Sequence, residues 1–109
     1  MTLDEKIGQM CQVWPEQGKL TPELQDLLRS GDIGSLINCS TSDLVAAAQE
    51  LVREESRLGI PLLVGRDVVH GYRTIFPIPL GQAASWNPAL IERTAMVAAE
   101  EAQSEGINW

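Results

Sequence analysis

Two short apolar runs flank one amphipathic stretch, and this arrangement limits the possible folds more than any other feature. Residues 33–37 (IGSLI) and 60–64 (IPLLV) are short, mostly apolar and bounded by turn-forming residues, as buried strands are. Between them, residues 42–58 repeat apolar side chains at helical spacing and end before Gly59. These apolar side chains are Leu44, Val45, Ala48, Leu51, Val52 and Leu58. Strand, helix and strand form a parallel crossover unit, so the sequence predicts an α/β fold.

Two further helices are expected before the first predicted strand. Residues 2–5 (TLDE) fit a capping box, which predicts a short opening helix. Its apolar face would consist of Leu3, Ile7, Met10 and Cys11. A second helix is predicted over residues 22–30, because Thr21 is a favourable N-cap, Pro22 suits the first helical position and Gly31 supplies the stop.

Residues 66–87 form a connection much longer than the roughly 2–6 residues usual between a strand and a helix, and long loops of this kind tend to be functional. The next helix is predicted to begin at Asn87 and Pro88, with Trp86 packing on Ile91 as a hydrophobic staple. Its buried stripe would be Ile91, Ala95, Ala98 and Ala102. Gly106 would end it, and residues 107–109 would open a third strand.

Charge and composition exclude several classes of partner. Eight Lys and Arg against fifteen Asp and Glu give a net charge of -7, which disfavours binding to nucleic acid or to an anionic membrane. No run approaches the roughly 18 apolar residues of a membrane span, and the first residues lack a signal-peptide pattern, so a soluble chain is expected. Cys11 and Cys39 are too few for a disulfide framework or a metal site, and we expect no cofactor.

Asp67 is the strongest candidate for a functional side chain. It follows the second predicted strand, at the end where sites gather in α/β folds. Two interpretations of its residue type and position stay open: a functional carboxylate, or a turn residue that caps its own loop or pairs with Arg66 or Arg73. His70 is the sole histidine, so no His-based triad or metal cage can form with it, and a role in organising the loop is favoured.

Other candidate sites have simpler explanations. The chain has no Gly-x-Ser-x-Gly, phosphate-loop or Gly-x-Gly-x-x-Gly motif, so acyl-transfer and nucleotide chemistries are unsupported. Four aromatic side chains could stack on sugars or bases, but core or staple roles are favoured for them: Trp14, Tyr72, Phe76 and Trp86. The pairs Glu54-Glu55 and Glu100-Glu101 lie in predicted helices, where solvated helix surface is the favoured interpretation.

Several motifs, taken in order, resemble glycoside hydrolase family 3. They are residues 67–71 (DVVHG), followed by residues 72–81 (YRTIFPIPLG) and residues 83–88 (AASWNP). The opening residues 1–10 resemble the start of that family's catalytic domain, and residues 105–109 (EGINW) resemble the segment before its third strand. The resemblance covers the chain end to end and is closest to periplasmic-type bacterial β-glucosidases. Arg66 departs from the family pattern, which has an apolar or aromatic residue before the Asp.

The resemblance implies the fold and the activity of a longer parent enzyme. Residues 1–109 would be an N-terminal fragment of the first domain, containing the first β/α units of a TIM-type (β/α)8 barrel, since a whole barrel needs about 250 residues. The parent would hydrolyse terminal β-linked glucosides or xylosides, or oligosaccharides that carry them, with retention of configuration. Its periplasmic or secreted location and its partners, the rest of the barrel and a second domain, are also implied by resemblance.

The resemblance assigns substrate binding to Asp67, whose carboxylate would accept hydrogen bonds from hydroxyls of the terminal sugar in the -1 subsite. Gly65 and Gly71 would let the backbone turn around it. Retaining hydrolysis needs two carboxyl groups about 5–5.5 Å apart. By resemblance both lie beyond residue 109, so this chain would hold no catalytic residue and be inactive alone.

There are two alternatives to this assignment, one from a different functional class and one within the enzyme class. The first is a self-contained small α/β module that binds a ligand or docks to a partner without catalysis. The second is a β-N-acetylglucosaminidase, which is less favoured because family members with that activity carry a different, glutamate-containing motif where residues 67–71 stand.

Overall fold

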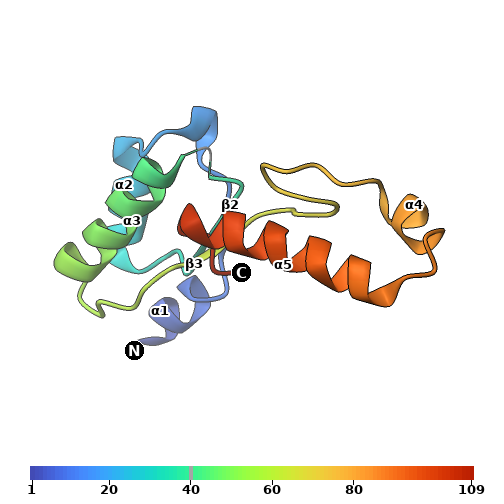
Figure 1. Ribbon diagram of the computed structural model, residues 1–109. Helices are drawn as coiled ribbons and strands as arrows, with labels where there is room; N and C mark the ends of the chain where they lie inside the picture. The colour runs from blue at the N-terminus through green and yellow to red at the C-terminus, as the bar shows by residue number, and fades with distance from the viewer. Residues whose placement is uncertain (40) are drawn as a thin grey trace. The chain divides into compact units, whose positions relative to one another are not determined.

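The computed structural model describes residues 1–39 and 41–109, which form two compact units (Figure 1). The first unit comprises residues 1–66 and 106–109 and is called the sheet unit. The second comprises residues 67–105 and is called the loop unit.

Among the described residues, the sheet unit holds a three-stranded parallel sheet. Its strands lie in the order β1 (Gln12–Val13), β2 (Ser35–Ile37) and β3 (Leu63–Gly65). A short 3-10 turn, η1 (Glu16–Gly18), and helix α2 (Pro22–Ser30) connect β1 to β2, and helix α3 (Ser42–Glu55) connects β2 to β3. The two helices pack against each other (Figure 1). Two successive parallel crossover units result, as α/β folds require.

Local capping signals explain where the helices of the sheet unit begin. In α1 (Leu3–Gly8) the capping box is present, with Glu5 N donating to Thr2 Oγ1 at 3.2 Å and Thr2 N donating to Glu5 Oε2 at 2.6 Å. The Thr21 hydroxyl accepts from Leu24 N at 3.3 Å, and α2 has the predicted bounds. Gly31 ends α2 in the left-handed conformation, at a φ of 82°.

The opening helix differs from the prediction on its apolar side. It ends at Gly8, before Met10 and Cys11 are reached. Leu3, Ile7 and Met10 are exposed, so the expected apolar face is not buried among the described residues. The capping residues therefore predicted the start of the helix but not its packing.

The core of the sheet unit forms where α2 and α3 meet the strands. Leu28, Leu36, Leu62 and Val64 are almost completely buried. The predicted stripe of α3 is confirmed, because Leu44, Val45, Ala48, Leu51 and Val52 are all buried. Burial of each large side chain contributes about 1.5–3 kcal/mol to folding, so this layer is the main source of stability in the unit.

The strands are shorter than predicted, and one was missed. β2 covers only the last three residues of the predicted run 33–37, and β3 is shifted toward the carboxyl side of the run 60–64. β1 has no apolar run of its own. It exists through register with β2, in which Gln12 lies opposite Ser35 and Val13 opposite Leu36.

Residues 107–109 lie along the free edge of β3 without forming a regular strand. Asn108 N and Trp109 N both donate to Val64 O, at 3.0 and 3.1 Å. The Asn108 side chain also accepts from Val64 N at 2.7 Å and donates to Leu62 O at 3.3 Å. Together with the backbone bond from Arg66 N to Trp109 O at 3.3 Å, these bonds hold residues 107–109 against β3, where the sequence predicts that a third strand opens.

The loop unit contains two helices, α4 (Pro79–Ala83) and α5 (Pro88–Ser104). The connection predicted over residues 66–87 therefore includes a helical turn that the sequence did not indicate. Asn87 caps α5 as predicted, since its Oδ1 accepts from Leu90 N at 3.1 Å. The predicted stripe is correct in part: Ala98 and Ala102 are buried and Ile91 is half-buried, but Ala95 is exposed.

The hydrophobic staple predicted before α5 is wrong. Trp86 is 92% exposed and adopts a φ of 52°, so its side chain does not pack on Ile91. A left-handed residue at this position turns the chain away from the helix face that a staple requires.

Candidate functional site

The residues that follow β2 and β3 are joined by hydrogen bonds at the carboxyl ends of these strands. Arg66 Nη1 donates to Cys39 O at 3.1 Å, and Arg66 N donates to Trp109 O at 3.3 Å. Asn38 N donates to Gly65 O at 2.9 Å. Arg66 is the residue that departs from the family pattern. Its hydrogen bonds connect the end of β3 to Cys39, which follows β2, and to Trp109.

Gly65 and Gly71 were both predicted to let the backbone turn around Asp67, but they have different roles in the structure. Gly71 adopts a φ of 122°, and a Cβ atom there would lie 2.0 Å from Thr74 O, so a tight turn requires glycine as predicted. Gly65 has no positive φ. A Cβ atom there would lie 3.1 Å from Trp109 Cε3, so Gly65 permits close packing of the Trp109 ring rather than a sharp turn.

Residues 70–76 form a small hairpin within the loop unit. Gly71 and Ile75 form an antiparallel bridge, and Phe76 N donates to His70 O at 2.8 Å. His70 Nδ1 donates to Phe76 O, also at 2.8 Å, so the imidazole closes the base of the hairpin. The loop-organising role predicted for His70 is confirmed.

The tip of this hairpin is held by one carboxylate of α5. Glu101 Oε2 accepts from Arg73 N and from Thr74 N, each at 2.8 Å, and Glu101 Oε1 accepts from the Thr74 hydroxyl at 2.5 Å. The bond from the Thr74 hydroxyl, followed by the backbone bonds from Thr74 and Arg73, lowers the pKa of Glu101. The Arg73 guanidinium also pairs with Glu105, the residue that caps the end of α5.

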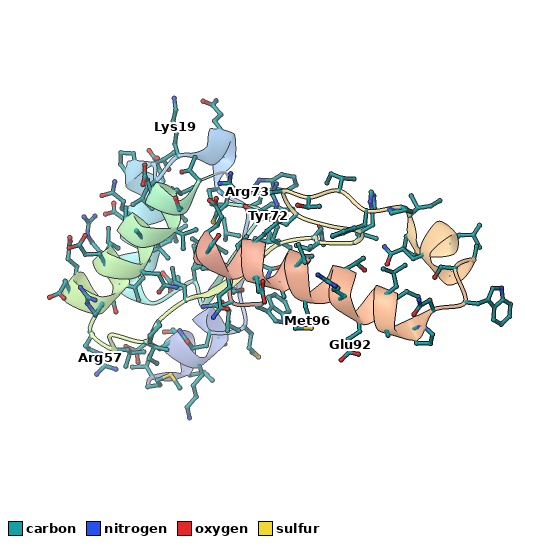
Figure 2. The ribbon with its side chains drawn as sticks, viewed as in Figure 1. Lys19, Arg57, Tyr72, Arg73, Glu92 and Met96 are labelled. Carbon is teal, nitrogen blue, oxygen red and sulfur yellow. The ribbon has the colours of Figure 1, made fainter. Side chains whose placement is uncertain are left out.

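Figure 2 shows Tyr72 and Arg73 beside the carboxyl-terminal half of α5, whereas Glu92 and Met96 lie on the opposite side of the helix. The interpretation of Glu101 as solvated helix surface is therefore wrong. The four-residue spacing of Glu101 and Glu105 was the available signal, because it places both carboxylates on one helix face. Their partners lie 27 to 32 residues away in sequence, which no local pattern indicates.

Asp67 stands two residues beyond β3 and three residues before His70, and its side chain is exposed. It is the first residue of the loop unit. Asp67 is therefore an exposed carboxylate that stands three residues before the start of a hairpin fixed by hydrogen bonds. An exposed carboxylate in such a position can accept hydrogen bonds from the hydroxyls of a ligand.

The remaining candidates have structural roles or are exposed. Glu55 pairs with Arg29 at 2.7 Å and Glu54 with Arg53 at 2.9 Å, as expected of helix-surface carboxylates. Trp14 and Trp86 are exposed, contrary to the predicted core and staple roles, whereas Tyr72 and Phe76 are half-buried.

The two cysteines lie in different environments. Cys39 is buried, and burial raises the pKa of its thiol, which disfavours the nucleophilic thiolate. Cys11 is exposed. Within residues 1–39 and 41–109, no three His, Cys, Asp or Glu side chains gather as metal ligands would. No helix in this part of the chain has the length and apolar character to cross a bilayer.

Comparison with known protein families gives a match over nearly the whole chain. Residues 2–109 match the model of the glycosyl hydrolase family 3 N-terminal domain. The chain belongs to glycosyl hydrolase family 3. The predicted fold class, the first β/α units of a TIM-type (β/α)8 barrel in a glycoside hydrolase, is confirmed by this match and by the structural relatives of the chain.

Individual relatives in family 3 are β-glucosidases by name. The chain is 40% identical to the periplasmic β-glucosidase of Salmonella typhimurium, over 99% of this chain and 14% of that protein. It is 31% identical to the lysosomal β-glucosidase of Dictyostelium discoideum, over 73% of this chain and 10% of that protein. A mutant β-glucosidase of Listeria innocua in complex with laminaribiose matches with a TM-score of 0.85 and 35% identity, over 99% of this chain and 17% of that one.

The chain therefore spans 10% to 17% of the length of these relatives. The similarity extends through 99% of the chain, which favours the glycoside hydrolase over the alternative of a self-contained ligand-binding module.

Proposed function

We propose that residues 1–109 are the amino-terminal part of a longer β-glucosidase that removes terminal β-linked glucosyl residues with retention of configuration. Support comes from the family match and from relatives that are named β-glucosidases, one of them in complex with the disaccharide laminaribiose. A location in the periplasm or outside the cell is part of the proposal and is supported by the name of the Salmonella relative.

Asp67 is the residue that we propose to bind the sugar. Its exposed position two residues beyond β3 is the observation that carries this assignment. The two oxygens of one carboxylate can accept hydrogen bonds from two adjacent hydroxyls of a terminal sugar, and each charge-assisted bond contributes about 1.5–3 kcal/mol. The proposed site is the -1 subsite, with Asp67 binding the sugar and not reacting with it.

The two catalytic carboxyl groups are proposed to lie outside residues 1–109. A retaining glycosidase needs a nucleophile and an acid/base about 5–5.5 Å apart, both aimed at the glycosidic bond. Glu5 is committed to Arg57, and Glu101 to the hairpin, so neither of these organised carboxylates is available for that role. The 109-residue chain by itself is expected to show no hydrolysis of aryl β-glucosides.

Substitution of Asp67 in the full-length enzyme tests the assignment. Asp67→Ala is expected to lower kcat/KM for an aryl β-glucoside by more than about a hundredfold, because two charge-assisted bonds to the sugar are lost. Glu100→Ala is the control, since Glu100 is an exposed carboxylate of the same unit. Wild-type kinetics for Asp67→Ala would show that this carboxylate does not hold the sugar.

A further inference from the structure

The hairpin next to Asp67 is fixed by hydrogen bonds at its base and at its tip. At the base, His70 and Phe76 exchange two bonds of 2.8 Å. At the tip, the backbone N–H groups of Arg73 and Thr74 converge on a single oxygen of Glu101. A backbone that donates two adjacent N–H groups to one carboxylate has little freedom to change its turn.

The arrangement at the tip joins a loop to a regular helix. Glu101 lies in the last turn of α5, a helix of 17 residues, whereas residues 70–76 contain one bridge of backbone pairing. The Thr74 hydroxyl binds the second oxygen of Glu101, so both oxygens of the carboxylate are used by the hairpin. The Arg73 guanidinium adds an ion pair with Glu105, the C-cap residue of the same helix.

We propose that Glu101 is a positioning residue for sugar binding, which acts by holding residues 70–76 in the conformation that presents Asp67 to the sugar. The inference rests on the proposed role of Asp67. It extends that role to a carboxylate that touches no substrate and lies 34 residues further along the chain. Asp67 is joined to the fixed hairpin by only two intervening residues, Val68 and Val69, so a change at the hairpin reaches Asp67 through a short backbone link.

Kinetics of the full-length enzyme test this proposal. Glu101→Ala is expected to lower kcat/KM for an aryl β-glucoside by between about tenfold and a hundredfold, because misplacement of a binding group by about 1 Å has effects of this size. Glu101→Gln keeps an acceptor oxygen and is expected to recover part of the loss. Glu100→Ala is the matched control, since it removes an exposed neighbouring carboxylate.

A double-mutant cycle separates positioning from a general effect on the fold. If Glu101 acts through Asp67, then Glu101→Ala should cost little further activity once Asp67→Ala is present, so the two effects are far from additive. Additive effects would overturn the proposal, and so would a Glu101→Gln variant no more active than Glu101→Ala. If Glu101→Ala does not fold, Thr74→Val can replace it, because this variant removes the bond to Oε1 of Glu101 at nearly constant side-chain shape. Thr74→Val is expected to lower kcat/KM by about threefold. This loss must vanish in the Asp67→Ala background.

The Asp67→Ala arm distinguishes this inference from the proposed function. Wild-type kinetics for Asp67→Ala would overturn the proposed function and the inference together. A large loss in Asp67→Ala with wild-type kinetics in both Glu101→Ala and Glu100→Ala would overturn only the inference.

Discussion

Different interactions stabilise the sheet unit and the loop unit, each within itself. In the sheet unit, large apolar side chains such as Leu36 and Val64 are completely buried between helices and strands. In the described part of the loop unit, the buried apolar side chains are Ala98 and Ala102. Many larger apolar side chains of that unit are exposed, namely Val69, Ile75, Ile78, Leu80, Trp86, Leu90 and Met96.

Polar contacts give the loop unit its shape instead. Glu101, His70 and the Asn87 cap each fix a turn or a helix end by hydrogen bonds. The difference agrees with the proposed division of tasks, in which an apolar core gives a rigid scaffold and a loop shaped by hydrogen bonds presents the proposed binding residue, Asp67. The following predictions test this contrast, from the largest expected effect to the smallest.

Truncation in the core should have the largest effect on stability. Leu36→Ala is expected to lower the free energy of unfolding by about 2–5 kcal/mol, because it removes buried methyl groups and leaves a cavity. Urea denaturation measures the effect. Leu63→Ala on the neighbouring strand is the control, since Leu63 is 51% exposed, and it should cost about 1 kcal/mol or less. Equal losses in the two variants would contradict the assignment of the core.

The ion pair of Glu5 should give a smaller effect that depends on pH. Arg57 donates to both oxygens of Glu5, at 2.8 and 2.6 Å, and with the Thr2 N–H it lowers the pKa of Glu5 from 4.5 to about 2. A carboxyl whose pKa falls on folding stabilises the folded state above its unfolded pKa, and this contribution is lost as the pH falls toward the folded pKa.

The wild-type protein should therefore be more stable than Glu5→Gln at pH 7, and the difference should shrink between about pH 4.5 and pH 2. Urea midpoints at pH 7 and pH 3 measure it. If the difference in stability between wild type and Glu5→Gln stayed constant over this range, the charge of Glu5 would not be the source of the stabilisation by the Glu5–Arg57 ion pair.

Removal of the Glu101 carboxylate should loosen the hairpin while leaving the sheet unit intact. In Glu101→Ala, the amide protons of Arg73 and Thr74 lose their acceptor, so they should exchange with solvent faster than in wild type. Amide hydrogen exchange measures this, with Leu36 as the internal reference and Glu100→Ala as the control. Unchanged exchange at both amides would contradict the described contact.

Substitution on the far side of α5 should have the smallest effect. Glu92 is exposed and lies on the side of the helix away from the hairpin (Figure 2). Glu92→Ala is expected to change the free energy of unfolding by no more than about 0.5 kcal/mol. A loss as large as that of Leu36→Ala would show that the loop unit depends on this face.

Features that the sequence predicted well are those set by neighbouring residues. The bounds of α2 follow from Thr21, Pro22 and Gly31, which lie within one turn of its ends. The buried stripe of α3 follows from helical spacing alone. A loop-organising role could be expected of His70, because no other histidine could join it in a metal or catalytic group, but the hairpin that it closes was not predicted.

Features that the sequence missed depend on partners far away along the chain. β1 is a strand only because Ser35 and Leu36 lie beside it, and its two residues have no pattern of their own. The Asn108 side chain adds bonds to Val64 N and Leu62 O, which lie 44 and 46 residues away. Glu101 was interpreted as solvated helix surface. Helix periodicity identifies the polar face of a helix, but it does not show that a loop packs on that face.

The most direct test of the account is a crystal structure of the full-length enzyme with glucose bound. The account predicts that both carboxylate oxygens of Asp67 lie about 2.6–3.2 Å from two adjacent hydroxyls of the sugar. A glucose molecule bound in the barrel with the Asp67 carboxylate turned away from it would contradict the proposed site.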